Sequence, residues 1–141
     1  MAISYHAEDI SFPKIKRREI TNWIKEIASD YNKRVGEISY IFCSDEKILQ
    51  INQQYLNHDY YTDIITFDYS EENTISGDLF LSLDTIKSNS DKYHVDYQQE
   101  MYRVIIHGIL HLCGLKDKTP KEEKIMRDSE NKALTILYKD K

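Results

Sequence analysis

The apolar stretch over residues 104–113 constrains this fold more than any other part of the chain. Its sequence is VIIHGILHLC, and its only polar side chains are those of His107 and His111. A helix that is apolar on every side belongs in the interior of a fold, because no face of it suits water. We therefore expect a central, buried helix that carries both histidines. Gly108 within it costs about 1 kcal/mol relative to alanine, which indicates a close approach by another part of the chain.

Turn residues and hydrophobic periodicity predict the elements around this helix. The helix itself is expected to begin after Asp96 as N-cap and to end at Gly114, in a left-handed conformation. The other expected elements are a helix over 14–32, strands over 37–43, 62–68 and 74–82, a short helix from 44 or 45 to 55, a helical stretch that Asp84 caps and that runs to about residue 90, and a last helix that Thr119 caps. This order predicts an α+β fold, with a small mixed β-sheet covered by helices.

The composition fits a single domain over residues 1–141. The chain has 40% hydrophobic residues, four glycines, two prolines and no repeat or linker-like run. No apolar run is long enough to cross a membrane, and the first residues lack the basic and then apolar pattern of a signal peptide. We therefore expect a cytoplasmic protein with no membrane contact. Cys43 and Cys113 are expected to be reduced, buried thiols; a metal-binding role for Cys113 is the less favoured alternative.

The net charge of −5 argues against a broad basic surface that grips nucleic acid nonspecifically. Local basic clusters occur within residues 14–18, 33–34 and 116–121. A cluster of this kind is more often a solvated face than a binding patch. Charge alone therefore does not favour a nucleic-acid partner, and we expect no DNA partner.

Four residues around the end of the central helix have the spacing of a metal site. His107 and His111 are one helical turn apart, so their rings project from the same face. Gly114 lets the chain turn so that Asp117 can return toward them. Two imidazoles and one carboxylate suit one zinc ion per chain and leave a fourth position for water. The alternative is that both histidines are satisfied inside the core, but burying two imidazoles without partners would cost several kcal/mol.

The spacing H-x-x-x-H-x-x-G-x-x-D differs from the metzincin pattern H-E-x-x-H-x-x-G-x-x-H in two residue identities. Gly108 replaces the glutamate that acts as general base in those metalloproteases. This replacement disfavours peptide hydrolysis. A metal ion could still lower the pKa of bound water toward about 7 and supply a hydroxide nucleophile, which suits hydrolysis of a phosphodiester.

Three stretches resemble the YbeY family of endoribonucleases, the ribosomal RNA maturation factors. HGILHLCG is similar to the family motif H-G-x-L-H-L-x-G, and GDLFLS at 77–82 is similar to G-D-I-x-I-S. INQQYLNHDYYTDIITF at 51–67 is similar to the stretch around L-N-x-x-Y-R-x-x-D-x-P-T-D-V-L-S-F. The resemblance runs from about residue 48 to residue 137, and the histidine motif is its specific part.

The resemblance implies a single-domain α+β fold with a zinc ion held by three side chains, which by position are His107, His111 and Asp117. It also implies single-strand-specific endonuclease activity on RNA, with roles in 16S rRNA 3′-end maturation and ribosome quality control. The implied partners are single-stranded RNA and rRNA of the small ribosomal subunit, with ribosomal proteins as a further expectation.

Two positions depart from the family pattern. The family ends its motif with a third histidine, in G-Y-D-H, where this chain has Asp117 in G-L-K-D; aspartate is a competent zinc ligand. The family's arginine in Y-R-x-x-D is Leu56 here, so a phosphate-binding group must come from elsewhere. Arg103, four residues before His107 on the same helical face, is our candidate, and a salt bridge to a neighbouring acid is the alternative. The expected catalytic group is therefore His107, His111 and Arg103.

Three further residues lie at or beside family positions. His58 could contact phosphate or act as an acid or base, although a surface histidine is the more frequent explanation. Asp63 and Asp78 match acids in the family stretches. A cap or a turn bond explains each of these acids at least as well as catalysis does.

Two alternative functions stay open. One is a ribosome-associated binding module in which zinc is structural and catalysis is weak; Leu56 and the acidic net charge keep it open. The other is a metzincin-like metalloprotease, and Gly108 speaks against it.

Overall fold

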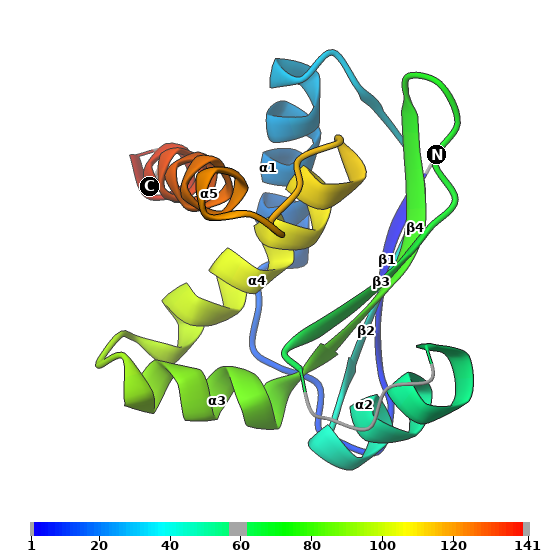
Figure 1. Ribbon diagram of the computed structural model, residues 1–141, viewed down its shortest axis with the longest axis vertical. Helices are drawn as coiled ribbons and strands as arrows, with labels where there is room; N and C mark the ends of the chain where they lie inside the picture. Colours follow the sequence, from blue (N-terminus) through cyan, green and yellow to red (C-terminus); the bar gives the residue numbers. More distant parts are fainter. Residues whose placement is uncertain (1, 57–61, 140–141) are drawn as a thin grey trace.

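Helices cover both faces of a four-stranded sheet in the computed structural model, which describes residues 2–56 and 62–139 (Figure 1). The elements in chain order are β1 (Ala2–Ala7), α1 (Arg17–Asp30), β2 (Arg34–Cys43), α2 (Asp45–Ile51), the π-helical turn η1 (Asn52–Leu56), β3 (Ile64–Asp68), β4 (Thr74–Ser82), α3 (Leu83–Lys92), α4 (Tyr97–Leu112) and α5 (Pro120–Lys139). α1, α4 and α5 lie on one side of the sheet and α2 on the other (Figure 1). This arrangement confirms the expected α+β class.

The sheet is mixed, as predicted. Its strand order is β1-β2-β4-β3, in which β1, β2 and β4 are parallel and β3 is antiparallel to β4. The edge strand β1 is absent from the predicted elements. Its alternation of Ile3 and Tyr5 with polar residues spans only six residues. Parallel pairing with β2, from Ala2 opposite Glu37 onward, is what makes this segment a strand.

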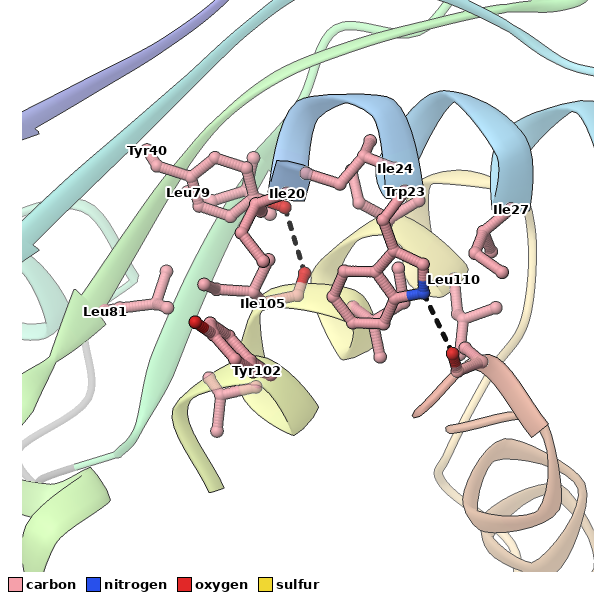
Figure 2. Close-up of a cluster of buried hydrophobic side chains, with 14 of the residues drawn as sticks. Ile20, Trp23, Ile24, Ile27, Tyr40, Leu79, Leu81, Tyr102, Ile105 and Leu110 are labelled. Carbon is pink, nitrogen blue, oxygen red and sulfur yellow. Dashed lines mark hydrogen bonds between the residues drawn. The ribbon is translucent and has the colours of Figure 1, made fainter. Parts of the chain in front are cut away.

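The main core lies between the sheet and the helices α1, α4 and α5 (Figure 2). The Tyr40 hydroxyl donates to the Ile105 carbonyl oxygen at 2.9 Å, and Trp23 Nε1 donates to the Ala133 carbonyl oxygen at 2.8 Å. Buried aromatic side chains need such partners, because an unpaired polar tip would lose its hydration without compensation. The first bond holds α4 against β2, and the second joins α1 to α5.

α4 is the central helix that the sequence predicts. Asp96 caps its start by accepting a backbone N–H three residues on, and Gly114 follows its end at φ +108°. Over residues 101–112 only Arg103, His107 and His111 are not buried. These three share one face at intervals of four residues, so the polar side of the helix is a single stripe. The helices of the described part of the chain, α4 included, are too short or too polar to cross a membrane.

Gly108 lets α4 pack directly against β3 and β4, which confirms the predicted close approach. A Cβ atom here would overlap Leu79 Cδ2 and lie 3.0 Å from Ile64 Cδ1. We expect Gly108→Ala to lower the free energy of unfolding by about 1 kcal/mol, because a repacking cost of about 1–3 kcal/mol exceeds the gain in helix propensity. Urea denaturation measures the change, with the exposed Ser88→Ala on α3 as a control. An alanine protein as stable as the wild type would contradict the close contact.

Three local predictions are corrected by the structure. Ser82, and not Asp84, caps α3, because the Ser82 hydroxyl accepts from the Thr85 N–H at 3.1 Å. β2 begins at Arg34, three residues before the predicted start. Asp63 precedes β3 rather than lying within it, and this position lets its side chain line the cavity described next.

Candidate active site

A cavity of about 380 Å³ lies between α3, α4, α5 and the residue before β3. Its lining residues are Asp63, Asn89, Tyr93, Glu100, Arg103, Val104, His107, Asp117, Glu123, Met126, Arg127 and Glu130. Five carboxyl groups, two guanidinium groups and one imidazole therefore face one space. The cavity brings together three of the predicted site residues, which are His107, Asp117 and Arg103.

His107 is held from both of its ring nitrogens. Its Nδ1 lies 2.7 Å from Oε2 of Glu130 on α5, and its Nε2 lies 3.3 Å from Oδ2 of Asp117. A carboxylate can only accept, so Nδ1 carries a proton. The Glu130 side chain is 8% exposed, and this buried contact fixes the orientation of the ring. Nε2 is consequently the nitrogen that faces Asp117.

The charges around His107 support one another. Burial alone would lower the pKa of His107, but the hydrogen bond and charge of Glu130, together with Asp63 and Asp117, outweigh burial and raise that pKa. Burial alone would raise the pKa of Glu130, but hydrogen bonds from His107 and Arg103 outweigh burial and lower it. Each group therefore stabilises the charged form of its partner.

The Arg103 guanidinium group is already paired. Its Nη1 lies 3.0 Å from Oε1 of Glu130, and its Nη2 donates to Oδ1 of Asn131 at 2.8 Å. This is the salt bridge that stood as the alternative to a phosphate-binding role. Arg127 on α5 is the more available cation, because it lies 3.7 Å from Glu130 and its side chain is 58% exposed, against 17% for Arg103.

The structure does not bring His111 into the cavity. His111 is exposed, one turn beyond His107 on α4, and the cavity lining does not include it. Within residues 2–56 and 62–139, no group of three or more His, Cys, Asp or Glu side chains is arranged closely enough to hold a metal ion. The described geometry thus joins His107 to Asp117 and leaves His111 apart.

The remaining candidates lie away from the cavity or outside the described residues. His58 falls outside them. Asp78 alternates with the core residue Leu79 along β4, so its side chain points to the opposite face of the sheet. Cys43 is buried and Cys113 half-buried, both as free thiols. Burial raises the pKa of Cys43 to about 12 and that of Cys113 to about 11, so neither is a thiolate at neutral pH.

Tyr93, Glu100, Arg127 and Glu130 are among the cavity residues that the sequence analysis does not identify. Glu130 is 23 residues from His107 in the chain, and only the packing of α5 against α4 joins them. One signal could have identified it. Glu130 lies on the buried face of α5 with Met126, Ala133 and Leu137, and a charged residue on an apolar face requires a partner.

The fold and the cavity define a small α+β protein whose central helix presents a histidine to a carboxylate-rich cavity. The family model described as Endoribonuclease YbeY matches residues 2–138. The chain therefore belongs to the YbeY family, as the histidine motif predicts.

Two relatives and one solved structure match this chain over nearly its whole length. The chain is 63% identical over 137 residues to Endoribonuclease YbeY of Parabacteroides distasonis. The matched residues cover 97% of this chain and 96% of that protein. It is 58% identical over 135 residues to Endoribonuclease YbeY of Porphyromonas gingivalis strain W83, covering 96% of this chain and 89% of that protein. The solution structure of a Thermotoga maritima protein matches with a TM-score of 0.70 and 25% identity, over 99% of this chain and 91% of that one.

Proposed function

We propose that this protein is a zinc-dependent endoribonuclease that cuts single-stranded RNA in the cytoplasm and acts in 16S rRNA 3′-end maturation and ribosome quality control. Membership of the YbeY family supports a nuclease that acts on RNA. The observation that carries the proposal is the pair formed by His107 Nε2 and Asp117 Oδ2, 3.3 Å apart at the wall of a cavity.

The donor atoms of this pair fit one zinc ion. A tetrahedral zinc bound to an imidazole nitrogen and a carboxylate oxygen, each at about 2.0–2.1 Å, separates the two donors by about 3.3 Å. The separation of Nε2 and Oδ2 is 3.3 Å. A carboxylate on the other ring nitrogen, here that of Glu130, is the usual support of a metal-bound histidine. His111 is exposed on the same helical face, so its ring is available as a third donor.

A bound zinc ion would supply a Lewis acid and would lower the pKa of a bound water molecule. The side chains of the protein have separate tasks. Glu130 holds the His107 ring so that Nε2 faces Asp117. We assign the phosphate of the substrate to Arg127, because its side chain is exposed at the cavity whereas Arg103 is paired. Arg127 would then take the role of the family arginine whose position is occupied by Leu56 in this chain.

A metalloprotease is disfavoured by the packing of α4. The general base of such an enzyme would stand at Gly108, where even a Cβ atom overlaps the side chain of Leu79. The binding-module alternative has one supporting observation. The cavity carries five carboxyl groups and two guanidinium groups, and such a negative surface weakens the binding of phosphate.

Metal analysis and an RNA cleavage assay test the proposal together. We expect about one zinc ion per chain, cleavage of single-stranded RNA that EDTA abolishes, and recovery when zinc is added. His111→Ala is expected to weaken zinc binding by at least about 10-fold without destabilising the zinc-free protein, because this side chain is exposed. Lys118→Ala, also exposed beside the site, is the control.

The outcomes separate the candidate functions. A protein that cleaves RNA equally well in EDTA would contradict a zinc-dependent enzyme. A protein that binds zinc and gains stability from it, but does not turn over RNA, would favour the binding module. Accumulation of unprocessed 16S rRNA in a deletion strain tests the role in ribosomal RNA maturation.

A further inference from the structure

Tyr93, directly after α3, contributes an exposed aromatic ring to the cavity. The residue is 56% exposed, and the ammonium group of Lys92 lies 5.4 Å from the centroid of its ring. Leaving this much aromatic surface in water is unfavourable unless a ligand covers it. Aromatic rings beside cations are the usual platforms on which the bases of single-stranded nucleic acids stack.

Glu100 on α4 faces the same cavity. The Glu100 side chain forms no hydrogen bond or salt bridge with any side chain that the structure describes. Glu130, by contrast, pairs with both His107 and Arg103. Burial raises the pKa of Glu100, although the charge of Arg103 opposes this effect. The Glu100 carboxylate is therefore a partly dehydrated acceptor that suits an N–H donor from a ligand.

The charge of the cavity decides which part of a nucleotide can enter it. Five carboxyl groups line it against two guanidinium groups, and the Arg103 guanidinium is already paired. Away from the exposed Arg127 side chain, such an interior repels a phosphate group but not an uncharged base. The volume of about 380 Å³ lies in the range of pockets for small ligands.

We propose that this cavity is a nucleobase pocket for single-stranded RNA, in which Tyr93 stacks on one base and the Glu100 carboxylate accepts a hydrogen bond from the exocyclic amino group of that base. The inference rests on the proposed function, since it takes RNA as the substrate, and it adds a base preference. A carboxylate accepts from the N4 amino group of cytosine and repels the O4 carbonyl oxygen of uracil. The pocket therefore favours cytosine over uracil, two bases of nearly equal size.

Binding of fluorescent octamers of cytidine and of uridine tests the stacking contact. Anisotropy is measured at one salt concentration and in EDTA, so that metal-dependent cleavage does not consume the RNA. Tyr93→Ala is expected to weaken binding of both octamers by at least about 5-fold, while Tyr93→Phe retains wild-type affinity because the ring remains. The matched control is Tyr69→Ala, which removes a tyrosine that is 59% exposed between β3 and β4.

The same assay tests the base preference. The wild-type protein is expected to bind the cytidine octamer at least about 5-fold more tightly than the uridine octamer. Glu100→Gln should remove this preference, because an amide can donate as well as accept, while Glu26→Gln on the exposed side of α1 should keep it.

Two results would overturn the proposal that this cavity binds a nucleobase. One is equal wild-type affinity for the two octamers, and the other is a Tyr93→Ala protein that binds like Tyr69→Ala. Either result leaves zinc content and RNA cleavage, and so the proposed function, unaffected. A wild-type protein that binds neither octamer would overturn both the pocket and the assignment of single-stranded RNA as substrate.

Discussion

Replacing His107 with alanine is expected to lower the rate of single-stranded RNA cleavage by at least about 100-fold. The imidazole stands between Glu130 and Asp117, with one ring nitrogen toward each carboxylate. Its removal takes away the proposed metal donor and leaves the two acids facing each other. Single-turnover cleavage at saturating zinc measures the effect.

The control for this variant is His6→Ala, because His6 is an exposed histidine on β1. The control should cleave like the wild type. Both variants are prepared in the same way, so that a contaminating nuclease would appear as residual cleavage in the His107→Ala sample. A His107→Ala protein that cleaves at the wild-type rate would exclude this imidazole, and the cavity beside it, from the reaction.

Replacing Glu130 with alanine is expected to lower the free energy of unfolding by about 3 kcal/mol. The carboxylate is nearly buried and lies 2.7 Å from His107 Nδ1 and 3.0 Å from Arg103 Nη1. Its loss removes the nearest carboxylate from two partly buried cationic groups, and His107 keeps only the more exposed Asp117 as an ion-pair partner. Glu130→Gln keeps the shape of the side chain and should show an intermediate loss, measured by urea denaturation.

Glu123→Ala is the matched control for Glu130, because Glu123 lies on the same helix but is exposed. Its effect should stay within about 0.5 kcal/mol. Equal stabilities of the Glu123→Ala and Glu130→Ala proteins would show that the contacts of Glu130 contribute nothing to folding, and that α5 is held to α4 by apolar packing alone.

The ion pair of Glu130 with His107 also predicts how the stability difference between wild type and Glu130→Ala depends on pH in zinc-free protein. The pKa of Glu130 is lowered in the folded protein, so its contribution is present above the pKa of an unfolded glutamate, about 4.3, and is lost as the pH falls through the lower folded value. The pKa of His107 is raised, so its contribution is present below about 6.5 and is lost as the pH rises through the folded value. The difference in unfolding free energy between wild type and Glu130→Ala should therefore be largest between the two unfolded pKa values, about pH 4.3 to 6.5, and should shrink on either side.

The sequence by itself determined the features that depend on neighbours within a few residues. The apolar run over 104–113 predicts the central helix, and Asp96 and Gly114 mark its ends as observed. Thr119, the predicted cap of the last helix, exchanges two 3.1 Å hydrogen bonds with Glu122, and the two residues form a capping box. Helical periodicity, caps and turns act over about four residues, so a single sequence contains the whole pattern. The histidine motif, equally local, was enough to indicate the family.

Only the tertiary structure decided how the site is assembled. It placed Glu130 against His107, neutralised Arg103 instead of leaving it for a phosphate, and left His111 exposed outside the cavity. These contacts follow from the way α5 packs against α4, and they join residues more than 20 positions apart. No short-range pattern encodes such a pairing, because a buried charge selects its partner by proximity in the folded chain and not by spacing along it.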